Sequence, residues 1–348
     1  MATDAAMMLS TSDLPAAAAE TPPEDVIVII PALNEECHIR DCILSLVEGD
    51  PIAGRCLVLV ADGGSTDRTA ETVTDLSRSH PNVRLVPNPG RLQAAGVNLA
   101  LADEHAGRKI LIRCDAHSAY PLGYVSRLVE TLLSKDAVSV VVPMDATVTG
   151  GCFQRALVWV ADTKIGAGGA RHRGGTQSGY VDHGHHAAFR LDAYRAAGGY
   201  DEAFRTNEDA ELDHRLRAAG GKIWLDAGIR VAYFPRSTPG GLWRQYLRYG
   251  DGRARTCLKH RIKPGLRQMI PAVNFILLIL SLMLVLVTPL GWLWPATYAA
   301  ILLATSLWVA AANRSACGLL AGLAVGIMHI GWAIGFLTRL ARGHRGPA

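Results

Sequence analysis

The sequence lacks several patterns that would fix its compartment or chemistry. Its seven cysteines are scattered and contain no CxxC pair, so there is neither zinc-ligand spacing nor a disulfide framework, and reduced thiols in a cytosolic compartment are expected. Residues 1–24 lack the basic start and continuous apolar core of a signal peptide, and their Ala, Thr, Pro and acidic residues predict a disordered segment. No internal repeat indicates a solenoid.

A Gly-rich phosphate loop is also missing after the first predicted strand. The continuous β-branched run Val26–Ile30 is typical of a strand buried on both faces of a parallel sheet. A nucleotidyltransferase with a parallel α/β sheet would carry a Gly-rich loop after its first strand. This chain has Pro31-Ala-Leu-Asn-Glu35 at that place. This replacement argues against nucleotidyl transfer.

Apolar residues are abundant but unevenly placed. They make up 49% of the 348 residues, and the excess lies after about residue 266. Three charge-free runs, 269–290, 292–312 and 318–337, each exceed the ~18 residues expected of a membrane-spanning helix. The sequence therefore predicts a membrane domain over residues 266–340 with about three apolar helices; the alternative is a buried helical subdomain.

Positive charge is concentrated just before these runs. Eight Lys and Arg residues lie from Arg244 to Arg267 inclusive, and Asp251 is the single acidic residue in this stretch. Such a stretch beside an apolar tail favours an anionic membrane surface or substrate over a nucleic acid. Residues 241–265 are accordingly predicted to be an amphipathic interfacial segment.

The basic residues before the first apolar run and those after the last run make conflicting predictions about membrane orientation if all three runs cross. The basic stretch before the first run favours a cytoplasmic catalytic part in an inner-membrane, multi-pass protein. Three full crossings would then place the basic tail 339–345 outside, against the positive-inside bias. Either the first or the last run does not cross fully, or the rule is broken here.

Strands alternate with helices before residue 240, which predicts an α/β domain with a mostly parallel sheet over residues 25–240. The expected strands are residues 26–30, 56–60, 83–86, 109–113 and 137–142. The helices expected between them end at about residue 47, end at about residue 77, and span 92–102 and 124–133. Two further strands are expected at 222–225 and 231–234, and the run 166–179 is expected to be a loop.

Acidic residues follow several of these strands, where open α/β sheets bind ligands. Glu35 and Asp62 could hold the base and ribose of a nucleotide, because ribose hydroxyls and a uracil N–H are donors. The Asp115-Ala-His117 spacing lets an oxygen and an imidazole reach one divalent ion, with Mg²⁺ preferring oxygen ligands and imidazole suiting Mn²⁺. The alternative for each is an ordinary turn residue.

An acidic pair opens the helix expected from Glu208 to Gly220. A carboxylate in the first turn suits the helix dipole, so a well-capped surface helix is the plain interpretation. The preceding acidic positions favour another, in which Asp209 is a general base. His183, His185 and His186 could form a second metal site, line an acceptor entrance or be loop histidines satisfied by local hydrogen bonds; no metal-spacing template fits them.

Four motifs together resemble the family 2 inverting glycosyltransferases of the GT-A fold. They are Pro31-Ala-Leu-Asn-Glu35, Asp62-Gly-Gly-Ser-Thr-Asp67, Asp115-Ala-His117 and Glu208-Asp-Ala-Glu-Leu-Asp-His-Arg-Leu216. The region Tyr180–Arg190 and the apolar tail look most like bacterial succinoglycan-type exopolysaccharide glucosyltransferases. The fold that the resemblance implies is a GT-A, Rossmann-like α/β domain followed by transmembrane helices.

The resemblance also implies roles for individual residues. Glu35 and Asp62, with Pro31 of the same motif, would contact the uridine of a UDP-sugar, Asp115 the ribose and donor phosphates, and Asp209, beside substrate-binding Glu208, would be the catalytic base. His117 replaces the second Asp of the family's DxD and would be a metal ligand with Asp115. A further set resembles the Q-x-x-R-W signature of membrane synthases, with Tyr in place of Trp: Gln245, Arg248 and Tyr249.

The function implied is metal-dependent, inverting transfer of a hexose, glucose first, from a UDP-sugar to a polyprenyl-diphosphate-linked saccharide. Membrane lipid and other exopolysaccharide assembly proteins are the expected partners, and the cofactor is Mg²⁺ or Mn²⁺. A processive β-polysaccharide synthase and a non-catalytic UDP-sugar-binding subunit are the rival interpretations. Three apolar runs are few for a polymer channel, and a pure binder has no need of a base.

Overall fold

The computed structural model describes residues 21–104, 107–148, 150–161, 163–166, 168 and 175–343, without the side chains of Asp103, Glu104 and His186. Most of the N-terminal segment expected to be disordered (1–20), half of the loop predicted over 166–179, and the last five residues of the chain, which include the end of the basic tail, lie outside this description. Residues Pro23–Asp25 form a 3₁₀ turn, η2.

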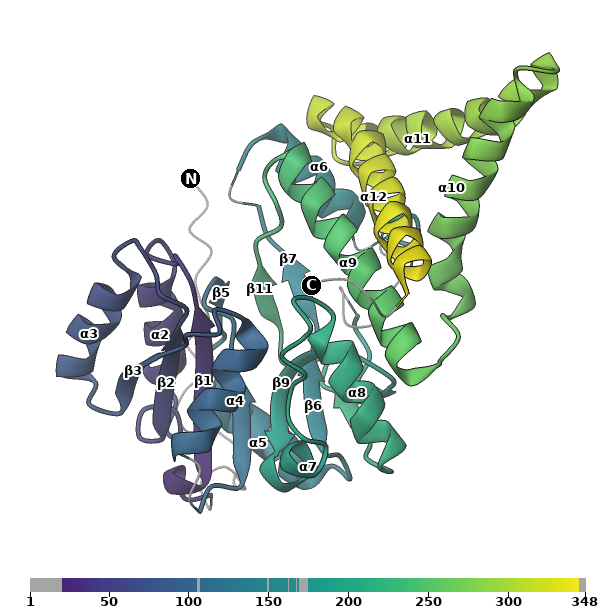
Figure 1. The fold of residues 1–348 in the computed structure, drawn as a ribbon. Coiled ribbons are helices and arrows are strands. Elements are labelled where there is room, and N and C mark those ends of the chain that lie inside the picture. Colours follow the sequence, from purple (N-terminus) through teal and green to yellow (C-terminus); the bar gives the residue numbers. More distant parts are fainter. Residues whose placement is uncertain are drawn as a thin grey trace. The chain divides into compact units, whose positions relative to one another are not determined.

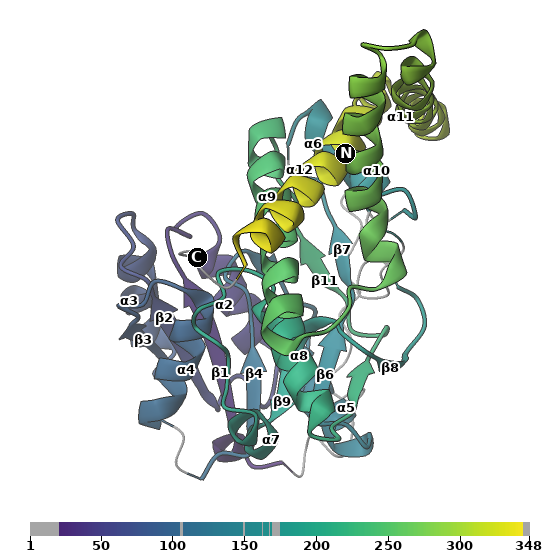
Figure 2. The same cartoon turned by 45° about the vertical axis from the view of Figure 1, so that its right-hand side comes forward.

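The chain divides into two compact units. The sheet unit comprises Met1–Asp145, Gly174–Glu202 and Glu208–Tyr233, and the helical unit comprises Ala146–Arg173, Ala203–Asn207 and Phe234–Ala348. The domain expected over 25–240 is therefore interrupted twice by segments that belong to the helical unit. The described residues are drawn in Figure 1, and Figure 2 shows them from a second side.

The sheet unit is built on an eight-stranded sheet in the order β3-β2-β1-β4-β9-β6-β10-β8. Its strands are β1 (Val26–Ala32), β2 (Leu57–Asp62), β3 (Val83–Pro87), β4 (Ile110–Arg113), β6 (Ser139–Val142), β8 (Gly179–Val181), β9 (His185–Arg190) and β10 (Ile223–Leu225). All seven residues of β1 are buried, as expected for a central strand with helices on both faces.

The sheet is mostly but not wholly parallel. Strand β1 pairs in parallel with β2 and β4, and β2 pairs in the same way with β3. Strand β9 lies between β4 and β6 and is antiparallel to both. Edge strand β8 is antiparallel to β10. A second sheet has the order β5-β11-β7, from Ser118–Ala119, Val231–Tyr233 and Met144–Ala146.

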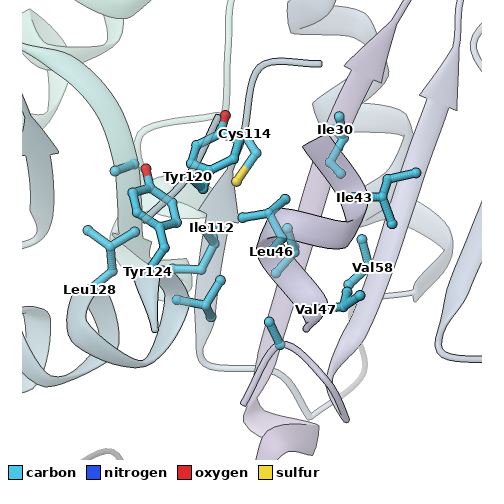
Figure 3. Packing of buried hydrophobic residues seen from close by; sticks show 14 of the residues in the cluster. Ile30, Ile43, Leu46, Val47, Val58, Ile112, Cys114, Tyr120, Tyr124 and Leu128 are labelled. Carbon is cyan, nitrogen blue, oxygen red and sulfur yellow. The ribbon is translucent and has the colours of Figure 1, made fainter. Parts of the chain in front are cut away.

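Helices cover both faces of the large sheet. They are α2 (Ile39–Val47), α3 (Thr69–Ser79), α4 (Gln93–Glu104), α5 (Tyr124–Ser134), α7 (Leu191–Ala196) and α8 (Glu208–Ala218). Because alternate β1 side chains point to opposite faces, Val28 and Ile30 pack with α2, α3 and α5, while Ile27 and Ile29 pack with α4, α7 and α8. Figure 3 shows the first of these cores between Ile30, Leu46 and Tyr124.

The expected strands and helices of the first 142 residues are confirmed to within about two residues. Sequence reasoning missed the short strands β5, β7 and β8 and the helices α6 (Cys152–Ala161) and α7. Strands of two or three residues are too short to show an alternating pattern. The helix expected at Glu208 is confirmed, with Leu212 and Leu216 buried. Ala219, just after the end of α8, is exposed.

In the part of the helical unit that the structure describes, α6 is accompanied by four longer helices. These are α9 (Pro239–His260), α10 (Leu266–Leu284), α11 (Leu293–Ala312) and α12 (Ala321–Arg342), with 3₁₀ turns η3 (Pro289–Trp292) and η4 (Ala316–Leu320) before α11 and α12. Within the described residues, three segments are long and apolar enough to cross a membrane: Leu266–Leu284, Pro289–Ala312 and Ala316–Arg342. The segment expected to lie on a membrane surface corresponds to α9, which packs lengthwise beside α12.

One expectation from the cysteines is wrong. Cys152 at the start of α6 and Cys317 in η4 form a disulfide across 165 residues of sequence. The described cysteines Cys37, Cys42, Cys56, Cys114 and Cys257 are free, as expected. The pair could not be read from spacing, because only the packing of α6 against η4 brings its members together.

Candidate active site

Three neighbouring strands end at the same edge of the sheet. Strands β1, β2 and β4 run in parallel and end at Ala32, Asp62 and Arg113. In open α/β sheets, ligands bind beyond the carboxyl ends of the strands. The segments that follow these ends contain Glu35, Asp62, Asp115 and His117, so the sheet unit gathers the carboxylates as the sequence predicted.

The loops after β1 and β2 are tied together by hydrogen bonds. Asn34, whose φ of 57° lies in the left-handed region, donates its backbone N–H to Ser65 Oγ and accepts from the Thr66 N–H at 2.8 Å. The Glu35 N–H donates to Thr69 Oγ1 at 2.8 Å. These bonds fix the backbone on which Glu35 and Asp62 are carried, as a site for a rigid ligand requires.

Pro31 and Asp62 take positions within this frame. Pro31 is buried in β1 opposite Ala61, beyond the last residue of β1 that pairs with β4. The Asp62 carboxylate accepts from the N–H groups of Gly64 and Ser65, each at 3.1 Å. These bonds form the ordinary turn that the plain interpretation of Asp62 predicted.

Glu35 and His117 contact each other. Oε1 of Glu35 lies 3.0 Å from Nδ1 of His117, with both side chains partly exposed. A carboxylate that pairs with one ring nitrogen sets the orientation of the imidazole. The bond therefore joins the loop after β1 to the loop after β4.

A buried arginine joins the loop after β4 to the first turn of α8. The side chain of Arg113, at the end of β4, is 3% exposed and donates to Oδ1 of Asp209. It also reaches Oδ1 of Asp115 at 3.4 Å and Oε1 of Glu208 at 3.5 Å. One cation thus holds three of the predicted site carboxylates in a single cluster.

His185, the first residue of β9, stands between two of these carboxylates. Its Nε2 lies 3.2 Å from Oδ2 of Asp115, and its Nδ1 lies 3.7 Å from Oδ2 of Asp209. His183 pairs instead with Asp213 at 2.8 Å, which makes it one of the satisfied histidines that the sequence allowed. The side chain of His186 lies outside the description.

Burial and charge separate the protonation behaviour of the cluster. Burial alone would raise the pKa of Asp115, but His185 and Arg113 hold that pKa well below its usual range. Burial, reinforced by the charge of Asp209 and opposed by Arg113, raises the pKa of Glu208 to about 7. Burial would lower the pKa of Arg113, yet Asp209 and its other neighbours hold it above the ordinary value. Such separation of neighbouring groups is typical of functional sites.

The described side chains include no group of three or more His, Cys, Asp and Glu that could hold a metal ion by itself. Asp115 and His117 nevertheless offer a carboxylate and an imidazole on one short loop. A divalent cation in nucleotide-dependent enzymes is commonly held by one or two protein ligands together with substrate phosphates. This donor set therefore fits a cation that arrives with a diphosphate rather than a preformed metal cage.

The remaining predicted residues lie on α9 in the helical unit. Nε2 of Gln245 donates to the Tyr249 hydroxyl at 2.9 Å, one helical turn away. The backbone carbonyl of Arg248 accepts from Thr206 Oγ1 at 2.9 Å, and Asn207 donates its amide to Thr256 Oγ1 at 2.7 Å. Helix α9 thus holds the segment that immediately precedes Glu208 and Asp209 in the chain.

Sequence reasoning missed Arg113 and Tyr200 as members of the site and did not assign His185 to it. The Tyr200 hydroxyl donates to Oδ1 of Asp209 at 2.9 Å. One signal was available for Arg113, because a cation at the end of an otherwise apolar strand is rarely buried without partners. Nothing in the spacing marked Tyr200 or distinguished His185 from its neighbours.

Comparisons with known proteins show the family and the fold of the chain. Residues 27–198 match the profile of Glycosyl transferase family 2. The succinoglycan biosynthesis protein ExoA of Rhizobium meliloti (strain 1021) is 43% identical over 321 residues, covering 90% of this chain and 94% of that protein. A glucuronosyltransferase of Methanococcus voltae, which acts on dolichyl N-acetyl-alpha-D-glucosaminyl phosphate, is 23% identical over 237 residues. The match covers 64% of this chain and 71% of that protein.

One solved structure gives the fold. The mannosyltransferase PcManGT of Pyrobaculum calidifontis, in complex with GDP-Man and Mn²⁺, superposes with a TM-score of 0.56 at 19% identity over 93% of this chain and 91% of that chain. The expected GT-A fold with a mostly parallel central sheet is confirmed.

Proposed function

Because the chain belongs to the family 2 glycosyltransferases, we propose that it transfers a hexose, glucose first, from a UDP-sugar to a lipid-linked saccharide in succinoglycan-type exopolysaccharide biosynthesis. The observation that carries this proposal is the cluster formed by Asp115, Arg113 and Asp209 at the carboxyl edge of the sheet. The similarity to the succinoglycan biosynthesis protein supports the pathway.

The chemistry assigned to the chain is a single displacement. A carboxylate oxygen of Asp209 removes the proton from an acceptor hydroxyl, whose oxygen forms a bond to the anomeric carbon. The bond from that carbon to the diphosphate oxygen breaks, and its electron pair leaves with UDP. One in-line attack inverts the anomeric centre, so a UDP-α-sugar gives a β-linkage.

Donor binding is assigned to the loops that follow β1, β2 and β4. Glu35 and Asp62, with Pro31 beneath them, would face the uridine, and Asp115 would face the ribose and phosphates, with Glu208 beside the base. Asp115 and His117 would hold Mg²⁺ or Mn²⁺, which supplies neutralisation of charge on the leaving diphosphate. On α9, Gln245, Arg248 and Tyr249 would contact the donor diphosphate.

The catalytic part is proposed to face the cytoplasm from the inner membrane. Three apolar segments in the helical unit support attachment to a membrane. An acceptor carried on a polyprenyl diphosphate would share that membrane with the enzyme. Other exopolysaccharide assembly proteins are the proposed protein partners.

A panel of radiolabelled UDP-sugars incubated with membranes, followed by lipid extraction, tests this function. Label that enters the lipid fraction as one added residue supports the proposal. Label in long polymer would instead favour a processive synthase, for which the Gln245-x-x-Arg248-Tyr249 sequence is the specific observation. No incorporation from any donor would favour a non-catalytic binding subunit.

A further inference from the structure

Asp209 receives two hydrogen bonds at the same oxygen. The Tyr200 hydroxyl donates to Oδ1 across 2.9 Å, and Nη1 of Arg113 donates to that oxygen as well. The other oxygen, Oδ2, faces Nδ1 of His185 at 3.7 Å. The two oxygens of the carboxylate therefore stand in different surroundings.

The two donors are themselves held from several directions. Arg113 donates to Oε1 of Gln93 on α4 at 2.9 Å and to the Tyr200 hydroxyl at 3.2 Å. Its guanidinium also stands over the Tyr200 ring, 5.4 Å from the centroid. The Tyr200 ring packs edge-on against Phe189 and Tyr194. Burying a guanidinium is costly unless partners compensate it. Both Nη groups of Arg113 have such partners, whereas its buried Nε has none among the described residues, so the contacts at the two Nη groups hold the cation in place.

We propose that Arg113 and Tyr200 are positioning residues for Asp209, an inference that rests on the proposed function. By taking Oδ1, they fix the carboxylate rotamer and make Oδ2 the oxygen that removes the acceptor proton. A general base must lie within hydrogen-bond reach of the proton that it takes, and a displacement of about 1 Å can cost on the order of 10²-fold in rate. Arg113 and Tyr200 neither gain nor lose a proton in the step.

The first experiment removes one hydroxyl. Tyr200→Phe keeps the packed ring and deletes the bond to Oδ1, so kcat should fall by about 10- to 100-fold while the KM for the UDP-sugar is unchanged. Tyr194→Phe is the matched control: its hydroxyl bonds to Asn98 and to the Tyr200 N–H rather than to Asp209, so kcat should stay near wild type. Equal loss in both variants would overturn the positioning role.

The second experiment tests whether Arg113 acts through Asp209. Arg113→Lys keeps the charge but loses the fork that reaches several acceptors, so kcat should fall in the wild-type background. In the Asp209→Asn background the same change should have little further effect, because residues that act as a unit are not additive. Independent, multiplicative losses would overturn the inference. If Arg113→Lys does not fold, Tyr200→Phe still decides.

These results separate this inference from the proposed function. Full turnover by Asp209→Asn would remove the base and with it the proposed chemistry. An inactive Asp209→Asn together with wild-type kcat in both Tyr200→Phe and Arg113→Lys would leave the chemistry intact and overturn the positioning role alone.

A separate observation concerns the membrane helices. Helix α12 is in close contact with α9: a Cβ at Gly331 would meet Trp243 and Tyr246, and one at Gly335 would lie 2.0 Å from the Leu247 carbonyl oxygen. Further along both helices, Arg339 Nε of α12 pairs with Asp251 Oδ1 of α9 at 2.8 Å. In Figures 1 and 2 the two helices run side by side.

This packing distinguishes α12 from the other two apolar segments. Within the most apolar stretch of each, 56% of residues are buried for Ala316–Arg342, against 6% for Leu266–Leu284 and 17% for Pro289–Ala312. Helix α9 contains Arg244, Arg248, Arg253, Arg255 and Lys259, and charges of this number are excluded from hydrocarbon. A helix packed along α9 is therefore held outside the bilayer core.

We infer that α10 and α11 alone cross the membrane, in contact with lipid chains, and that α12 returns to the side of α9. The described part of residues 21–233 lies on that side too: its apolar helix Cys152–Ala161 is shorter than a membrane span, and no described segment before α9 is long and apolar enough to cross. The basic segment before α10 and the residues Arg339 and Arg342 then share one side, as the positive-inside bias requires.

Fusions to the full chain test this arrangement. Alkaline phosphatase, which is active only outside the cytoplasm, is placed after residue 348 or within 285–288 between α10 and α11, and green fluorescent protein is used as the reciprocal reporter. We expect phosphatase activity at 285–288 and fluorescence at residue 348. Phosphatase activity at residue 348 would show that α12 crosses, and an inactive insertion at 285–288 would show that α10 does not; either overturns the inference.

Discussion

His117 Nδ1 lies 3.0 Å from Glu35 Oε1, so an expected metal ligand and an expected nucleotide contact are bonded to each other. The pair orients the imidazole from outside the Asp115–His117 loop. Partners that orient a metal-binding histidine typically contribute 10–100-fold to metal affinity. The two residues therefore act together in the proposed site.

The first prediction concerns this pair. His117→Ala should raise the Mn²⁺ concentration needed for half-maximal binding in the presence of UDP, and Glu35→Gln should raise it by a smaller factor, within about 10–100-fold. Metal binding is measured by electron paramagnetic resonance titration. Glu71→Gln is the control, because its carboxylate pairs with exposed Arg68 away from the cluster. An unchanged titration in His117→Ala would exclude a ligand role.

The second prediction concerns the proposed base. Asp209→Asn should retain binding of UDP and lose transfer by about 10²–10⁴-fold, since the amide cannot accept the hydroxyl proton. Calorimetric titration with UDP and transfer of radiolabelled sugar measure the two properties. Near-normal turnover would remove Asp209 from the mechanism.

The third prediction concerns pH and stability. The pKa of Glu208 is raised to about 7 in the folded protein by burial and by Asp209, above the ~4.3 expected when unfolded. The folded state then binds more protons between these values, so its stability is highest below the unfolded pKa and falls as pH rises toward 7. Asp115, whose pKa is lowered, titrates below this window.

Glu208→Gln should flatten this dependence, because the amide does not ionise. The unfolding midpoint of purified protein, measured between pH 5 and pH 8, should fall with pH in the wild type and change less in the variant. A parallel decline in both proteins would mean that Glu208 does not cause it.

The fourth prediction concerns the Cys152–Cys317 disulfide. Closing a loop of this length can stabilise a fold by at most about 5 kcal/mol in the chain-entropy description. Reductant should therefore lower the unfolding midpoint of the wild type, and the double change Cys152→Ser and Cys317→Ser should remove the response. Cys37→Ser, at an exposed free cysteine, is the control that should keep it.

The same bond bears on the proposed compartment. Disulfides are rare where glutathione keeps thiols reduced. Trapping the thiols of intact cells with acid and an alkylating agent measures the state of the pair before purification. We expect two reduced thiols if this part of the chain faces the cytoplasm, and a bonded pair in cells would argue for an oxidising compartment.

The order of the main strands and helices, and the segments from which the proposed site is built, could be predicted from local sequence patterns. Buried strands such as Val26–Ala32 are continuous apolar runs, and apolar periodicity and turn residues are local signals that survive without a structure. The antiparallel direction of β9 could not be predicted from such local signals. It depends on how the chain turns before β9 pairs with β4 and β6, and composition does not show this.

Which side chains meet depends on how the chain packs. Arg113 and Asp209 are separated by 96 positions, and Cys152 and Cys317 by 165, so no spacing rule joins either pair. The apolar content of α12 predicted a membrane span, but contact with α9 buries much of that surface. Local sequence sets which secondary structure a segment can form. Whether its side chains are buried, and which residues they pair with, depends on the segments that pack against it.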